Sequence, residues 1–189
     1  MACIYLIRHG RPTSTWGGAD DDPGLDPAGW SQAEAAAAAL CALPPGQRPA
    51  QVISSPLRRC RETATPFARA IGAEIQIEPA VGEIPTPAAL VAADRPGWLG
   101  QAMSGQWSQI VGDLDYLDWR KAVVNAIARR PGAAIFSHFI AINAVLSALA
   151  GDPRTVVFRP DHASMTILEA GEEGLAVVRR GREASTQVL

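Results

Sequence analysis

The chain has 189 residues, of which 48% are hydrophobic and 19% are charged, and its formal net charge is -2. These values are typical of a soluble globular protein, and the length fits one α/β domain, which we expect to span residues 1–189. The small net charge excludes the strongly basic surface that a nucleic acid or an anionic membrane would need in a partner. Lys121 is the single lysine beside 16 arginines, and because no glycine-rich loop precedes it, a P-loop kinase or ATPase is excluded.

The three cysteines, Cys3, Cys41 and Cys60, are odd in number and have no paired spacing. They therefore indicate neither a disulfide framework nor a structural zinc site, and a reducing cytoplasm is the simplest location. The first residues lead directly into an apolar run that ends at Arg8, and no stretch of the chain approaches the roughly 18 uncharged apolar residues of a membrane span. We expect neither a signal peptide nor a transmembrane helix.

The first half of the chain predicts strands alternating with helices. Residues 3–7 form a short apolar run with β-branched and aromatic members, which is typical of a strand buried on both faces. Asp26 and Pro27 suit the N-cap and the first position of a helix, and Gly72 suits the end of another. The elements predicted after the first strand are a helix over 26–43, a strand over 51–54, a helix over 57–71 and a strand over 74–78.

Prolines and glycines interrupt residues 79–113, so we expect one-turn or two-turn helices there, in an insertion that covers one face of the molecule like a lid. The elements predicted after this insertion are a helix over 115–130, a strand over 133–136, a helix over 140–150 and an antiparallel hairpin over 163–170 and 175–179. The alternation predicts an α/β fold with a mainly parallel central sheet, helices on both of its faces, and the hairpin at its edge.

Ligands of such sheets bind beyond the carboxyl ends of the strands, where this sequence places two histidines and several arginines. Arginines would repel a cation, so these residues make a poor metal site. They suit a phosphoryl group instead, because the guanidinium fork binds phosphate oxygens and an imidazole nitrogen is a competent nucleophile for phosphorus. Chemistry of this kind needs no cofactor.

Five short motifs follow one another along the chain. Arg8-His9-Gly10 ends the first strand, residues 25–33 read LDPAGWSQA, and residues 54–64 read SSPLRRCRETA. Glu83 comes soon after the third strand, and Ser137-His138 ends the fourth. In type, order and spacing, these motifs resemble those of the histidine phosphatase superfamily, whose fold is that of phosphoglycerate mutase. The resemblance extends to about residue 168.

The resemblance implies a role for each matching residue. His9 would attack phosphorus, and Arg8, Arg59 and His138 would hold the phosphoryl oxygens. Glu83 would protonate the leaving alkoxide and later deprotonate the attacking water. Arg59 is preferred over its two arginine neighbours because it has the position of the arginine in the family motif.

This sequence departs from the family pattern at three positions. Thr15 stands where many members have Asn, so a hydroxyl replaces one phosphate contact or the contact is lost. Phe139 places a large apolar group beside the phosphate, and with Gly10 these residues complete the predicted substrate-binding set. His162 also replaces an Asn, and the sequence leaves open whether it lines the site or lies on the surface. It leaves the same question open for Trp98 and Trp107.

The expected activity is that of a metal-independent phosphatase that hydrolyses a small phosphomonoester through a phosphohistidine at His9. Three alternatives remain from the sequence: a phosphoglycerate mutase-like phosphotransferase, a phosphohistidine phosphatase that acts on proteins, and a phosphate-binding module without catalysis. The absence of mutase-type loops weighs against the first, and the insertion over residues 79–113 weighs against the open site of the second.

Overall fold

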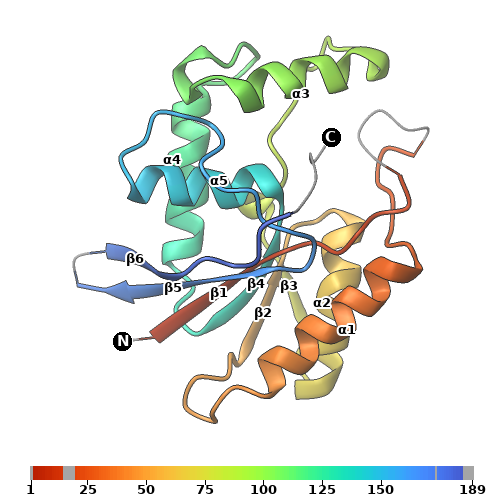
Figure 1. Ribbon diagram of the computed structural model, residues 1–189, viewed down its shortest axis with the longest axis vertical. Coiled ribbons are helices and arrows are strands. Elements are labelled where there is room, and N and C mark those ends of the chain that lie inside the picture. Colours follow the sequence, from red (N-terminus) through yellow and green to blue (C-terminus); the bar gives the residue numbers. More distant parts are fainter. Residues whose placement is uncertain (1, 15–19, 173, 185–189) are drawn as a thin grey trace.

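The computed structural model describes residues 2–14, 20–172 and 174–184 (Figure 1). Its strands are β1 (Ala2–Arg8), β2 (Gln51–Ser54), β3 (Ile75–Ile77), β4 (Ala133–Ser137), β5 (Met165–Gly171) and β6 (Gly174–Arg179). Its α-helices are α1 (Pro27–Cys41), α2 (Arg58–Ile71), α3 (Arg95–Ser104), α4 (Tyr116–Ala128) and α5 (Phe139–Leu149). Short 3-10 turns are η1 (Pro79–Val81), η2 (Ala92–Asp94) and η3 (Trp107–Gln109).

The strands form one mixed sheet in the order β3-β2-β4-β1-β5-β6. The first four strands in this order run parallel, whereas β5 pairs antiparallel with both β1 and β6. The predicted fold class, including the antiparallel edge hairpin, is therefore confirmed. In the register, Arg8 lies beside Ser137 and Ser54 lies beside Phe136, so β1, β2 and β4 end at the same edge of the sheet.

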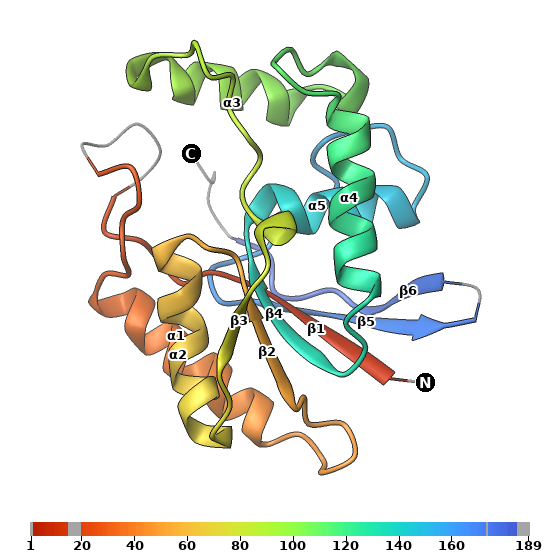
Figure 2. The ribbon, with the colours of Figure 1, turned by 180° about the vertical axis from the view of Figure 1, so that it is seen from behind.

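Helices cover both faces of this sheet (Figures 1 and 2). On one face, Tyr5 and Ile7 of β1 pack in a buried cluster with side chains of α1 and α2. On the other face, Ile4 and Leu6 pack with side chains of α4 and α5. Alternate residues of β1 thus enter two separate cores, which explains why its sequence is continuously apolar. None of the helices in the described part of the chain is long and apolar enough to cross a bilayer.

The residues expected to begin α1 and to end α2 do so in the structure. The Asp26 carboxylate accepts a hydrogen bond from the Gly29 N–H at the start of α1, with Pro27 at the first helical position. Gly72 ends α2 with φ of 66°, in the left-handed region that glycine adopts without strain.

Residues 79–113 contain three one-turn 3-10 helices, as predicted. The ten-residue α3 is longer than the two turns expected, because Pro96 lies in its first turn, where a missing N–H costs no helical hydrogen bond. Figure 2 shows α3 extended beyond the end of the sheet. Trp107 anchors the segment: it is buried, and its indole N–H donates to Ser147 Oγ of α5 at 2.9 Å. The Trp98 indole N–H donates to the Val111 carbonyl at 2.7 Å. This hydrogen bond joins α3 to the end of the same segment.

Candidate active site

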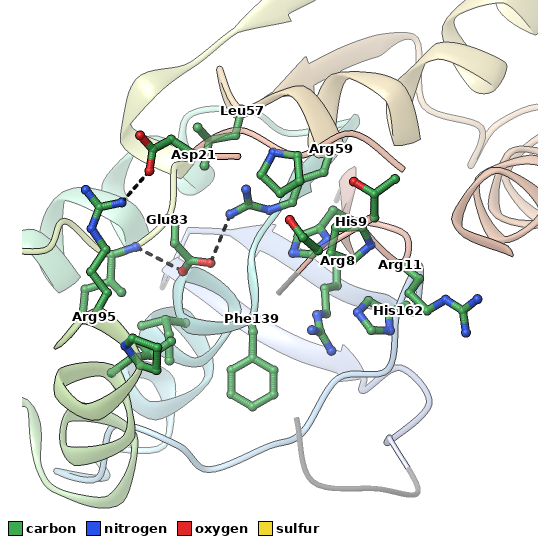
Figure 3. Close-up of a pocket in the computed structure, with 18 of the residues that line it drawn as sticks. Arg8, His9, Arg11, Asp21, Leu57, Arg59, Glu83, Arg95, Phe139 and His162 are labelled. Carbon is green, nitrogen blue, oxygen red and sulfur yellow. Dashed lines mark hydrogen bonds and ion pairs between the residues drawn. The ribbon is translucent and has the colours of Figure 1, made fainter. Parts of the chain in front are cut away.

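A cavity of about 850 Å³ opens where β1, β2 and β4 end (Figure 3). Arg8 and His9 contribute from the end of β1, Arg59 from the first turn of α2, and Phe139 from the first turn of α5. Glu83 enters from the loop after η1. The structure thus brings to one place five of the residues that the sequence singled out, as expected for parallel strands whose carboxyl ends meet.

His9 is held in a single tautomer by the backbone. Its Nδ1 lies 2.8 Å from the Gly10 carbonyl oxygen, which can only accept a hydrogen bond, so Nδ1 carries the proton and Nε2 keeps its lone pair. Burial and the charges of Arg59 and Arg8 hold the pKa of His9 well below its usual value. The imidazole is therefore neutral at pH 7, with an unprotonated nitrogen that is able to act as a nucleophile.

Gly10 positions His9 from behind the cavity wall. Its N–H donates to the Thr63 hydroxyl at 2.9 Å, and that hydroxyl donates to the Arg59 carbonyl at 2.6 Å. A Cβ on Gly10 would lie 2.6 Å from the carbonyl oxygen of Gly29, so only glycine allows the loop after β1 to cross α1 so closely. In the structure, Gly10 therefore makes a packing contact with the backbone of α1. Thr15, also predicted to bind substrate, lies outside the described residues.

Arg8 is buried, and only part of its guanidinium group makes hydrogen bonds. One terminal nitrogen donates to the Pro160 carbonyl at 2.9 Å, while Nε is buried without a partner among the described residues. Burial lowers the pKa of Arg8 to about 10, which still leaves the guanidinium charged at pH 7. Its central carbon lies 5.3 Å from the centre of the Phe139 ring, a cation–π contact that fixes both side chains.

Arg59, His138 and Glu83 form a second group beside His9, in which Arg59 and His138 are buried and the Glu83 side chain is 10% exposed. An Arg59 terminal nitrogen lies 3.3 Å from His138 Nδ1 and 3.7 Å from Glu83 Oε2. His138 is fully buried behind these side chains, with its ring 5.3 Å from that of His9, and Ser55 Oγ lies 2.7 Å from its Nε2. His138 therefore reaches the cavity only past its neighbours.

Glu83 combines a largely buried carboxyl with a fixed loop. Burial raises the pKa of Glu83, and the nearby Arg59 only partly opposes this effect. Its Oε1 accepts a hydrogen bond from the Ile84 N–H at 3.1 Å, and Ser137 Oγ of β4 donates to the Val81 carbonyl two residues earlier. The strand end thus holds in place the loop that carries a carboxyl suited to donate a proton.

The sequence left open whether His162 lines the site or lies on the surface, and the structure shows that it lines the cavity. Its ring lies 5.9 Å from that of His9, and burial together with Arg8 lowers the pKa of His162 to about 4. Neither Trp98 nor Trp107 is among the lining residues. Sequence reasoning missed Arg11 and Arg95, which line the wall in ion pairs with Asp26 and Asp21 respectively.

The cavity presents groups for binding an anion. Within residues 2–14, 20–172 and 174–184, no three His, Cys, Asp or Glu side chains are arranged to hold a metal ion. Cys60 adjoins His138, with its Sγ 3.3 Å from Nε2, but burial raises the pKa of its thiol, so it remains protonated. Two buried guanidinium groups, a neutral histidine and a protonatable carboxyl together fit a tetrahedral oxyanion.

The fold and this cavity define an α/β protein with a histidine- and arginine-lined cavity at the carboxyl ends of the parallel strands of a mixed sheet. A family model described as "Histidine phosphatase superfamily (branch 1)" matches residues 4–183. The chain therefore belongs to the histidine phosphatase superfamily, and the resemblance seen in the sequence is confirmed. None of the curated protein sequences compared with the chain matches it significantly.

Solved structures of phosphatases share the fold. A phosphoserine phosphatase from Entamoeba histolytica, in complex with 3-phosphoglyceric acid, superposes with a TM-score of 0.76 at 18% identity, covering 96% of this chain and 98% of that one. For a mycobacterial glucosyl-3-phosphoglycerate phosphatase the TM-score is 0.69 at 22% identity, with coverages of 94% and 97%. For a putative alpha-ribazole-5'-P phosphatase from Escherichia coli it is 0.72 at 17% identity, with both coverages 97%.

Proposed function

We propose that the protein is a metal-independent phosphatase that hydrolyses small phosphomonoesters through a phosphohistidine at His9. The observation that carries this proposal is the hydrogen bond from His9 Nδ1–H to the Gly10 carbonyl, which leaves an unprotonated Nε2 in a cavity beside two arginines. Membership of the superfamily and the phosphatase neighbours support the same class of reaction.

In the first step, His9 Nε2 forms a bond to phosphorus while the bond from phosphorus to the ester oxygen breaks. The departing alkoxide takes the proton of Glu83, whose raised pKa favours the protonated state that this step needs. Arg8 and Arg59 stabilise the negative charge on the phosphoryl oxygens, the main task of a protein in phosphoryl transfer. His138, behind Arg59, supports this group.

In the second step, ionised Glu83 removes a proton from a water molecule, whose oxygen attacks the phosphohistidine. The bond between phosphorus and Nε2 breaks, inorganic phosphate leaves, and His9 returns to its neutral form. No oxidant, reductant or metal ion enters this balance. This mechanism uses a single domain, in which residues 79–113 act as a lid over the cavity. Leu99 and Met103 of α3 line the cavity, so the lid would reduce access for large protein substrates.

Trapping the phosphoenzyme tests the proposal. Brief incubation with a radiolabelled alkyl phosphomonoester, followed by rapid denaturation, is expected to give a phosphoprotein that is labile in acid and stable in base. His9→Ala should abolish both the label and turnover. Arg61→Ala is the matched control for Arg59→Ala, because Arg61 is exposed on the same helix, and only the Arg59 change should weaken turnover strongly.

Full turnover by His9→Ala would overturn the proposal. Release of a phosphorylated product instead of inorganic phosphate would favour the mutase alternative, and binding of phosphate without turnover would favour the non-catalytic one.

A further inference from the structure

We infer that the alcohol released by this enzyme has an apolar body and carries no anionic group; the inference rests on the proposed phosphatase function. The cavity volume of about 850 Å³ lies in the upper part of the range of roughly 300–1,000 Å³ that is usual for ligand pockets. A phosphoryl group held by Arg8 and Arg59 occupies only a small part of it. The rest of the cavity is available to the leaving group.

That remaining wall is mainly apolar. It is formed by side chains from the N-cap of α2, the loop after Glu83, α3 and α5, namely Leu57, Ile84, Leu99, Met103, Phe139 and Ile140. Apolar walls of this kind bind a leaving group through its hydrocarbon surface, because contact removes both surfaces from water.

The cations outside the phosphate group are already paired. Arg11 Nε lies 2.5 Å from Asp26 Oδ2, and an Arg95 terminal nitrogen lies 2.9 Å from Asp21 Oδ1. In Figure 3, the Arg95–Asp21 pair lies at the left of the view and His9 and Arg8 lie at the right, with Glu83 and the Arg59 guanidinium between them. A carboxylate on the leaving group would have to compete with an aspartate for either arginine.

Two further lining residues, Asp20 and Asp161, add negative charge. Asp20 forms no ion pair in the described part of the chain, and Asp161 has one distant contact of 3.9 Å with the exposed Arg182. Residues 15–19 and 185–189 contain no lysine or arginine, so neither segment supplies a compensating side chain. Beyond the phosphate, the charge balance of the wall therefore disfavours a second anion and tolerates a neutral or cationic group.

The opposing possibility is that Arg95 leaves Asp21 and binds a substrate anion. Arg95 Nε is buried without a partner among the described residues, so it is available to donate to such an anion. Substrates that differ only in one charged group separate the two cases.

The experiment compares kcat/KM for benzyl phosphate, 4-carboxybenzyl phosphate and 4-(aminomethyl)benzyl phosphate, whose reacting ends are alike. We expect benzyl phosphate to exceed the carboxylated ester by about tenfold or more, and the aminomethyl ester to remain close to benzyl phosphate. Methyl phosphate should be a poorer substrate than benzyl phosphate by about tenfold or more, and Leu99→Ala should reduce that difference. Equal or faster turnover of the carboxylated ester would overturn the inference.

A variant then tests the paired arginine directly. Asp21→Asn leaves Arg95 without its partner, so it should raise kcat/KM for 4-carboxybenzyl phosphate more than for benzyl phosphate. Asp118→Asn is the matched control, because Asp118 forms an exposed ion pair with Lys121 on α4, and it should change neither value. A uniform effect of Asp21→Asn on both esters would contradict the inference. Failure to hydrolyse any of the esters would instead reject the phosphatase function itself.

Discussion

Replacing Glu83 by Gln removes the proposed acid while preserving its shape. The Gln side chain retains an oxygen to accept the hydrogen bond that Oε1 now receives from the Ile84 N–H at 3.1 Å. Its amide nitrogen would stand where Oε2 lies, 3.4 Å from His138 Nδ1 and 3.7 Å from the Arg59 guanidinium. The substitution therefore changes the proton that is available to the leaving group more than it changes the fold of the loop.

The expected loss depends on the leaving group. A positioned general acid contributes about 10²–10⁴-fold to the rate, so turnover of an alkyl phosphate should fall by about that factor in Glu83→Gln. A nitrophenolate departs readily without a proton, so turnover of nitrophenyl phosphate should fall far less. Steady-state assays of benzyl and 4-nitrophenyl phosphate with both enzymes measure this contrast. Equal losses on the two esters would refute the assignment of Glu83 as the acid.

The pH profile gives the same test a second readout. The alkyl reaction needs Glu83 protonated, so kcat/KM should fall as the pH rises through its raised pKa, and this alkaline limb should vanish in Glu83→Gln. On the acid side, attack fails once His9 is protonated, and its lowered pKa puts that limb well below pH 6.5.

Glu83→Gln should lower the activity of the enzyme without lowering the stability of its fold at pH 8. Folding raises the pKa of Glu83, so its contribution to stability is lost as the pH rises through the folded-state pKa, where the buried carboxyl must ionise. Glu83→Gln does not ionise, and its melting temperature at pH 8 should equal or exceed that of the parent. A large drop in melting temperature would mean that the loss of activity reports damage to the fold.

Three other predictions concern packing, the third histidine and metal ions. Gly29→Ala should lower the free energy of unfolding by about 1–3 kcal/mol in urea titrations, because its Cβ would overlap the Arg11 carbonyl oxygen; Gly97→Ala, with open space around it, is the control. The His162 ring lies in the cavity wall 5.9 Å from that of His9, where its N–H would donate to a phosphoryl oxygen. His162→Ala should therefore raise the activation free energy by about 1.5–3 kcal/mol, and His162→Asn, which retains a donor, should recover part of it. Turnover by His162→Ala equal to that of the parent enzyme would refute this role. Treatment with EDTA should leave turnover intact, and activity restored only by added Mg²⁺ would contradict the metal-independent mechanism.

Much of the fold follows from short-range patterns in the sequence. The apolar run before Arg8 predicted β1, and Asp26 with Pro27 predicted where α1 begins, because burial and capping act within a few residues. The alternation of strands and helices then required parallel pairing, which brings strand ends together. That rule is why His9 and His138, far apart in the chain, were expected in one site.

The sequence by itself determined the family, the layered α/β fold and the residues at the ends of the strands, because these depend on local periodicity and on motifs with fixed spacing. Tertiary structure alone decided that His138 lies buried behind Arg59, that Gly10 packs against the α1 backbone, and that Arg95 meets Asp21 across 74 residues. Such contacts depend on the crossing of distant segments, which no local pattern encodes. The charge and depth of the cavity beyond the phosphate therefore emerged only once the chain was folded.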